Sequence, residues 1–131
     1  MELTVHHVAI TVRNMDESLA WYTHVFGAEV LARYEKRGME IAHLKFDAVR
    51  LEFFSGDKTQ PLPEYRTTLM GDLNVVGTKH VCFETNDIEG LKKELVGRGV
   101  EFATEIDTAG FGGKFAFIKD PNGILIELYQ A

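Results

Sequence analysis

Hydrophobic positions recur with two periods along the chain. Apolar residues two apart, the period of a strand, and apolar residues three or four apart, the period of a helix, follow one another in the same order in both halves. The predicted strands cover 4–12, 28–35, 39–46 and 49–54, then 79–85, 100–104, 114–118 and 124–129; the predicted helices cover 16–26 and 87–97. The pattern predicts an α+β fold built from two repeated βαβββ modules.

Both predicted helices carry start and stop signals. Asn14 and Asn86 each stand three residues before a glutamate, which is the spacing of a capping box. Gly27 follows the last apolar residue of the first helix, and Gly97 or Gly99 ends the second. The two segments therefore resemble each other in their boundaries as well as in their hydrophobic pattern.

The repeat divides the chain into a first module of about 4–54, a linker of 55–77 and a second module of about 78–130. The linker contains two prolines and no convincing periodicity, and a loop of this length in a compact domain is usually functional or joins two modules. The sequence DPNG, 120–123, predicts a turn before the last strand. A single domain of residues 1–131 is expected.

Composition narrows the classes of function. With 131 residues, 45% hydrophobic and 26% charged, the chain has the balance of one soluble domain, and no apolar stretch predicts a membrane span. A net charge of -6 disfavours nucleic-acid and anionic-membrane partners, which require basic surfaces. Cys82 is the only cysteine, so no disulfide is expected, and it is expected to be a buried strand residue. The N-terminus has no signal-peptide pattern, which favours a cytoplasmic location.

Strand alternation sorts the candidate polar residues by side. In 4–12 the aliphatic residues fall on one side together with His6, while His7 falls on the other. The same alternation separates His80 from its apolar neighbours in 79–85. It also separates Glu52 and Glu127 from the apolar residues of their own strands. If the two modules form a curved mixed sheet with helices outside, the four side chains His7, Glu52, His80 and Glu127 share the inner side.

Two imidazoles and two carboxylates on one side predict a divalent-metal site, because a metal ion would offset the cost of burying the two carboxylates. Nitrogen and oxygen ligands together suit Ni, Co, Zn, Fe, Mn or Mg. Any one of these residues alone is more often a structural histidine or a solvated glutamate. Their matching positions in both modules favour the metal site. No role is assigned to His6, His24 or His43.

The segments HHVAITVRNMDESLAWYTHVFGAEV, GTKHVCFETNDIEGL and FIKDPNGILIELYQ resemble the opening, middle and end of the vicinal oxygen chelate superfamily, which includes glyoxalase I, bleomycin resistance proteins and extradiol dioxygenases. The resemblance implies paired βαβββ modules forming a cleft around a metal, usually in a homodimer. It also implies His7, Glu52, His80 and Glu127 as the metal ligands.

By this resemblance the leading hypothesis is a metal-dependent lyase or isomerase of the glyoxalase I type. Its substrate would be a small molecule with adjacent oxygens, such as a thiol adduct or a CoA thioester. Glu127 and Glu52 would act as bases on a carbon next to a carbonyl. The alternatives are a methylmalonyl-CoA epimerase-like isomerase, an Fe(II) dioxygenase, a thiol transferase of the fosfomycin-resistance type, and a non-catalytic small-molecule binding protein.

Overall fold

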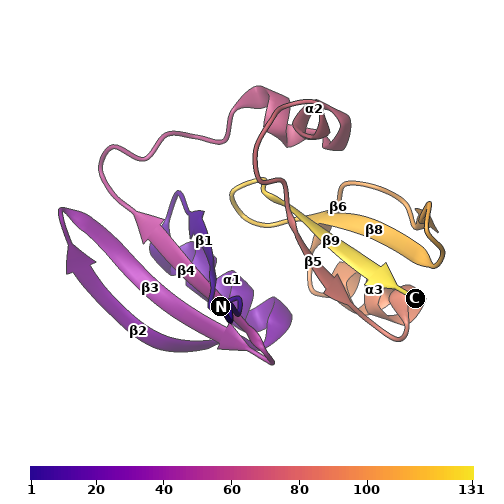
Figure 1. Ribbon diagram of the computed structural model, residues 1–131, viewed down its shortest axis with the longest axis horizontal. Helices are drawn as coiled ribbons and strands as arrows, with labels where there is room; N and C mark the ends of the chain where they lie inside the picture. The colour runs from indigo at the N-terminus through magenta and orange to yellow at the C-terminus, as the bar shows by residue number, and fades with distance from the viewer. The chain divides into compact units, whose positions relative to one another are not determined.

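The computed structural model describes all of residues 1–131 as two compact units, Met1–Pro61 and Leu62–Ala131. Each unit contains its own mixed sheet and its own helix packed against that sheet (Figure 1). The predicted α+β fold of two βαβββ modules is therefore confirmed.

The first unit has four strands and one long helix. The elements are β1 (Val8–Thr11), α1 (Met15–Phe26), β2 (Glu29–Lys36), β3 (Met39–Phe46) and β4 (Val49–Ser55). The strand order is β1-β4-β3-β2, in which β1 pairs with β4 in parallel and the other pairs are antiparallel. Tyr22 of α1 packs its ring against Phe53 of β4, and Phe26 stacks on Phe46 of β3. These contacts form the core between helix and sheet.

The second unit repeats this plan with shorter strands. Its elements are β5 (Val81–Glu84), α3 (Ile88–Gly97), β6 (Glu101–Phe102), β7 (Asp107–Thr108), β8 (Lys114–Lys119) and β9 (Leu125–Gln130). The order is β5-β9-β8-β6, with β7 also paired to β8, and β5 runs parallel to β9. Ile88 and Leu95 of α3 are buried, as are Ile126 and Leu128 of β9. The first strand of each module thus pairs in parallel with the last.

The segment between the modules contains two short helices that the hydrophobic pattern did not predict. They are the 3₁₀ helix η1 (Glu64–Thr67) and α2 (Leu69–Leu73). Helices this short carry too few apolar residues to show a period. The predicted linker is therefore partly ordered into local structure.

One helix start agrees with the prediction and the other does not. The Asn14 side chain accepts a hydrogen bond from the backbone N–H of Glu17 at 2.9 Å, which confirms the first cap. The prediction of Asn86 as the second cap is wrong: Asp87, one residue later, accepts from the backbone N–H of Gly90 at 2.9 Å. Both residue types can cap a helix, and the start of α3 at Ile88 decides between them.

The helix ends follow the glycines. Gly27 closes α1 in the left-handed conformation, with φ of 69°, and its N–H bonds the Thr23 carbonyl. The second helix ends at Gly97, Arg98 caps it with φ of -89°, and Gly99 takes the left-handed conformation with φ of 82°. A left-handed residue is needed where the chain reverses after a helix, and glycine adopts it without strain.

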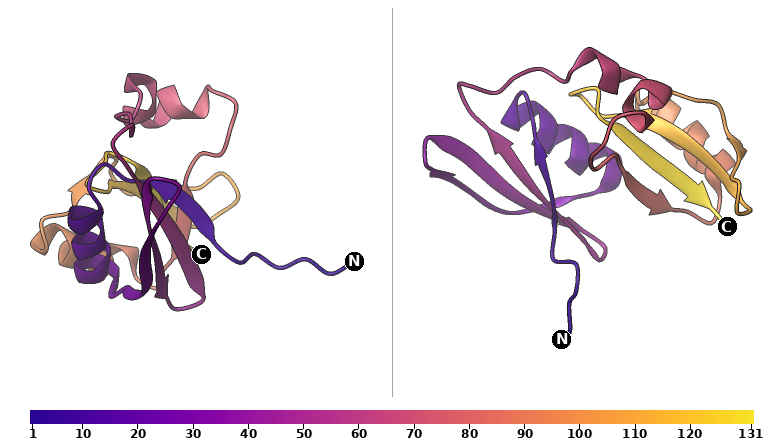
Figure 2. Two further views of the ribbon diagram at one scale, coloured as in Figure 1. Left: turned by 90° about the vertical axis from the view of Figure 1, so that its left-hand side faces the viewer. Right: turned by 45° about the horizontal axis from the view of Figure 1, so that its top comes forward.

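The first strand of each module is shorter than the alternation predicts, with four residues in both β1 and β5. Residues 1–6 form an extended exposed segment that leads into β1 (Figure 2). The histidines at positions 7 and 80 therefore lie just before their strands rather than inside them.

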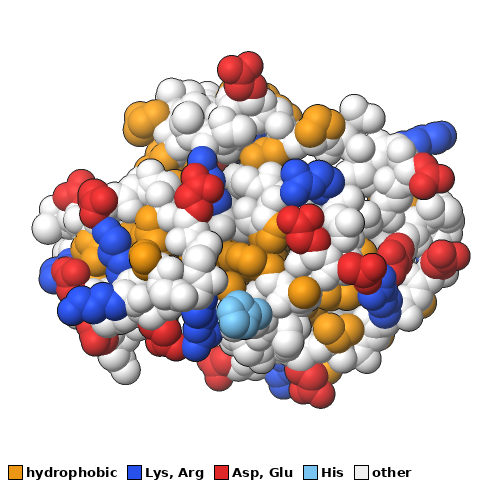
Figure 3. Space-filling view, turned by 180° about the vertical axis from the view of Figure 1, so that it is seen from behind, with side chains coloured by type: hydrophobic (Ala, Val, Ile, Leu, Met, Phe, Trp, Pro, Cys, Tyr) orange, Lys and Arg blue, Asp and Glu red, His pale blue; other side chains and the backbone are white.

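Acidic and basic side chains are interspersed over the face shown in Figure 3, with hydrophobic side chains between them. Ion pairs within a unit include Arg13–Glu17 and Lys114–Glu89. None of the helices has the length and hydrophobicity needed to cross a bilayer.

The corrected cap of α3 gives a direct test. Asp87→Ala is expected to lower the free energy of unfolding by about 1 kcal/mol, because the N–H of Gly90 loses its acceptor. Asn86→Ala, its neighbour and matched control, is expected to change it by less than about 0.5 kcal/mol. Urea titration followed by circular dichroism measures both values. An equal loss in the two variants would contradict the assignment.

Candidate metal centre

Parallel strand pairing places a histidine near a glutamate in each module. Ala9 of β1 pairs with Glu52 of β4, and Cys82 of β5 pairs with Glu127 of β9. The histidine stands two residues before the paired position in both cases, on the same side of the strand by alternation. The two modules therefore repeat one His–Glu arrangement, as the sequence repeat predicts.

In the first unit, the His7 Nε2 lies 3.8 Å from Oε1 of Glu52. The His7 side chain is 35% exposed and that of Glu52 is 17% exposed. The other ring nitrogen, Nδ1 of His7, lies 2.8 Å from Nδ1 of His6. One of the two nitrogens must donate to the other, so His6 restrains the ring of His7. Alternation placed His6 on the opposite side, but β1 begins only at Val8 and does not govern the direction of His6.

In the second unit, the corresponding pair is closer. The His80 Nε2 lies 2.9 Å from Oε2 of Glu127, and both side chains are largely buried. The ring of His80 meets the ring of Phe117 edge to face, with centroids 4.8 Å apart. Nδ1 of His80 is buried without a hydrogen-bond partner. The orientation of this ring therefore depends on one carboxylate, one aromatic contact and the position of its own backbone.

His43 is a further polar residue at the first pair, and the sequence analysis assigned it no role. It faces Glu52 across the β3–β4 ladder, with its Nε2 3.4 Å from Oε2 of Glu52. The hydroxyl of Tyr34 lies 2.9 Å from the same Nε2, and the two rings stack. The carboxylate of Glu52 thus has one oxygen toward His7 and the other toward His43. The turn between Phe46 and Val49 fixes this register. Counting three residues back from Phe46 and three forward from Val49 pairs His43 with Glu52.

Cys82 is exposed, and the prediction that it is a buried strand residue is wrong. It lies on the side of β5 that carries His80 rather than on the side that packs against the core. Desolvation, followed by the negative charge and hydrogen bonding of Glu127 and then the charge of Glu84, raises the pKa of the Cys82 thiol to about 11. The thiol is therefore protonated at neutral pH and is neither a nucleophile nor a ready metal ligand.

The donor atoms of the second pair fit a divalent cation. Adjacent ligands around a six-coordinate ion, with bonds of about 2.1 Å, lie roughly 3 Å apart. The 2.9 Å between His80 Nε2 and Glu127 Oε2 is compatible with this spacing and is also the length of their direct hydrogen bond, while the 3.8 Å of the first pair is longer. No group of three or more His, Cys, Asp or Glu side chains is arranged to hold a metal ion. The pairs belong to different units, and the site of four ligands stays a prediction.

Comparison with known proteins agrees with the repeat and the fold. The sequence profile of the Glyoxalase/Bleomycin resistance protein/Dioxygenase superfamily matches residues 4–128. Mitochondrial methylmalonyl-CoA epimerase of Dictyostelium discoideum is 29% identical, over 96% of this chain and 77% of its own. The lactoylglutathione lyase of Schizosaccharomyces pombe is 27% identical, over 95% of this chain but only 46% of its own. The crystal structure of a glyoxalase family protein from Enterococcus faecalis superposes with a TM-score of 0.83 at 28% identity, over 96% of both chains.

The raised pKa of Cys82 predicts slow alkylation that depends on Glu127. Because the negative carboxylate disfavours the thiolate, Glu127→Gln is expected to lower the thiol pKa and to speed alkylation several-fold at pH 8. The rate with iodoacetamide, followed by mass spectrometry from pH 7 to 10, measures this. Glu84→Gln, the matched control, is expected to have the smaller effect. A native rate equal to that of the urea-unfolded chain would contradict the raised pKa.

Proposed function

Because the chain belongs to the Glyoxalase/Bleomycin resistance protein/Dioxygenase superfamily, we propose that it is a divalent-metal-dependent lyase or isomerase of the glyoxalase I type. The observation that carries this proposal is the repeated His–Glu pair at the start and end of each module, at 3.8 Å in one unit and 2.9 Å in the other. The stability of the two sheets alone does not require a histidine before the first strand and a glutamate in the last strand of both modules.

His7, Glu52, His80 and Glu127 would hold the ion. When bound, a divalent ion supplies Lewis-acid polarisation of two neighbouring oxygens of a substrate. The apolar residues that flank each glutamate in its strand, Leu51 and Phe53 or Ile126 and Leu128, are buried. Each carboxylate therefore projects from the side of its sheet opposite to the core.

The two glutamates carry the proton transfer in this proposal. Each would leave the ion to act as base: Glu127 would accept a proton from the carbon next to the substrate carbonyl, and Glu52 would serve the opposite face of that carbon. His43 Nε2 lies 3.4 Å from the second oxygen of Glu52 and 2.9 Å from the hydroxyl of Tyr34, so this carboxylate has a polar neighbour on each side. The largely buried setting of both glutamates limits competing contact with water.

The substrate under this proposal is a small molecule with adjacent oxygens, carried as a thiol adduct or a CoA thioester. Lactoylglutathione lyase is among the relatives of this chain, which supports the glyoxalase type. As in the superfamily resemblance, the working form is proposed to be a homodimer.

An epimerase acting on a 2-acyl thioester is the second candidate. The similarity to methylmalonyl-CoA epimerase extends over 77% of that relative, against 46% for the lactoylglutathione lyase. An epimerase and a glyoxalase I share the removal of a proton next to a carbonyl and differ in the substrate that carries it. The substrate on which the protein acts therefore distinguishes the two candidates.

Removing either histidine tests the metal site. His7→Ala and His80→Ala are each expected to weaken Ni or Mn binding by at least about a hundredfold, since each removes a ligand. Titration calorimetry on protein stripped with EDTA measures the affinity. His24→Ala, on α1 and outside either pair, is the control and is expected to bind as the natural chain does. Unchanged affinity in His7→Ala would contradict the proposed ligand set.

Exchange of a substrate proton with solvent tests the chemistry. In D₂O the metal-loaded protein is expected to exchange the proton next to the carbonyl of either the methylglyoxal–glutathione hemithioacetal or methylmalonyl-CoA. Glu127→Gln is expected to slow this by about 10² to 10⁴-fold, as for the loss of a general base. Glu89→Gln, an exposed glutamate of α3, serves as control. If neither substrate exchanges its proton, the proposed chemistry is wrong.

A further inference from the structure

His80 lies one residue before the first paired residue of β5. The ladder between β5 and β9 begins with Val81 opposite Ile126, so residues 78–80 precede the strand. The His80 ring has one hydrogen-bond partner, Glu127, and its Nδ1 has none. Metal-binding histidines usually gain their orientation from a hydrogen bond of the second ring nitrogen. Here that bond is missing, so the position of the preceding backbone orients the ring together with the contacts to Glu127 and Phe117.

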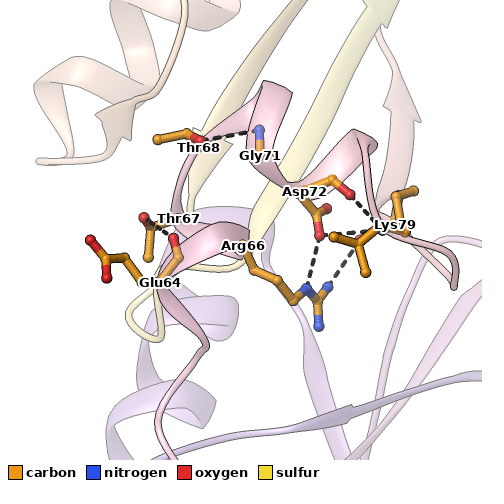
Figure 4. Close-up of polar contacts among 8 residues, drawn as sticks. Glu64, Arg66, Thr67, Thr68, Gly71, Asp72 and Lys79 are labelled. Atoms are coloured by element: carbon orange, nitrogen blue, oxygen red, sulfur yellow. Dashed lines mark hydrogen bonds and ion pairs between the residues drawn. The ribbon is translucent and has the colours of Figure 1, made fainter.

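The residue just before His80 is held by a partly buried ion cluster of Arg66, Asp72 and Lys79 (Figure 4). Asp72 is only 2% exposed. Arg66 Nε donates to Oδ1 of Asp72 at 3.0 Å, and Nζ of Lys79 lies 3.5 Å from the same oxygen. The charge of this carboxylate is thus matched by two cations, which a buried carboxylate requires.

The same residues also hold the backbone of residue 79. Nη2 of Arg66 donates to the carbonyl of Lys79 at 3.3 Å. Nζ of Lys79 donates to the carbonyl of Asp72 in α2 at 2.6 Å and to that of Val75, two residues after the end of α2. Both the main chain and the side chain of Lys79 are therefore anchored to the segment 66–75.

That segment is itself a defined structure. Thr68 caps α2 by accepting from the N–H of Gly71 at 3.2 Å (Figure 4). A Cβ at Gly71 would overlap the carbonyl oxygen of Tyr65, so η1 and α2 pack closely at this point. The anchor of Lys79 is thus held in place by two helical turns rather than by a loose loop.

The first module has no counterpart of this anchor. The residues before His7 are exposed, and the contact of its ring on that side is with His6. The pair without the anchor is also the more widely spaced one, with 3.8 Å for His7–Glu52 against 2.9 Å for His80–Glu127. The repeat predicts two equivalent pairs, but only the second follows an ion cluster.

We propose that Arg66, Asp72 and Lys79 form a positioning cluster that holds the backbone before His80 and thereby sets the imidazole against Glu127. The proposal rests on the proposed metal-dependent function, since it assigns the cluster to one of the two ligand pairs. It gives the segment between the modules a role in the site: Arg66 and Asp72 act on the metal through His80 without touching it.

The test uses Arg66→Met, which removes both hydrogen bonds of the guanidinium and keeps much of the apolar stem. Arg98→Met removes an ion pair with Glu94 in the same unit and is the matched control. Asp72→Asn, nearly isosteric, is the second variant if Arg66→Met does not fold. The urea midpoint of each variant is measured first, so that a general loss of stability is known.

The first readout needs no metal. Nuclear Overhauser contacts between the rings of His80 and Phe117, assigned with His80→Ala, are expected to fall by more than half in Arg66→Met and to persist in Arg98→Met. Asp72→Asn is also expected to weaken the contacts between the rings of His80 and Phe117. If the folded Arg66→Met protein keeps these contacts and the His80 ring signals unchanged, the cluster only stabilises the fold and the proposal is wrong.

The second readout is the affinity for Ni by titration calorimetry. Arg66→Met is expected to raise Kd about tenfold, as for other residues that orient a metal ligand. In a His80→Ala background the same change is expected to have no further effect, and a further tenfold loss there would overturn the proposal. If the unaltered protein binds no divalent ion while its ring contacts still depend on Arg66, the proposed function fails and the positioning of His80 stands.

Discussion

The parallel pairing of the first and last strands of each module is the constraint on which the rest of the site depends. It sets Ala9 opposite Glu52 and Cys82 opposite Glu127. Because neighbouring residues of a strand point to opposite faces, this register turns each glutamate away from the helix and toward the side of the histidine. A shift by one residue would bury both carboxylates in the core and expose the leucines and isoleucines beside them.

The same register explains why the two units resemble each other and where they differ. The core side of each sheet is apolar and closely packed, as the contact of Tyr22 with Phe53 illustrates. The other side carries polar groups, and the residues next to each glutamate differ between the two units. Glu52 lies between two histidines, His7 and His43, whereas Glu127 lies between His80 and the thiol of Cys82.

Much of this arrangement is readable from the sequence, because periodicity and capping are local properties. The alternation around His7, Glu52, His80 and Glu127 places each His and Glu of a module on one side, and the pairs at 3.8 and 2.9 Å follow from it. The cap at Asn14 is local in the same way. Whether the four residues hold one ion depends on how the two modules are placed relative to each other, which no local sequence pattern determines.

The features that the sequence did not predict depend on strand register or on contacts between residues far apart in the chain. His43 reaches Glu52 through the β3–β4 ladder, and Arg66 reaches Lys79 across 13 positions through two short helices without a period. Asn86 and Asp87 are both residue types that cap helices well, and only the start of α3 at Ile88 shows that Asp87 is the cap. The exposure of Cys82 follows from its place on the side of His80, whereas the expectation of burial rested on its apolar neighbours in the sequence.

In the proposed site, one divalent ion takes its ligands from both His–Glu pairs. Anomalous diffraction at the nickel edge, from crystals of the Ni-loaded protein, tests this arrangement. We expect a single strong peak ligated by the imidazoles of His7 and His80 and the carboxylates of Glu52 and Glu127. A peak ligated by one pair alone, or by His6, His24 or His43 in place of these histidines, would contradict it.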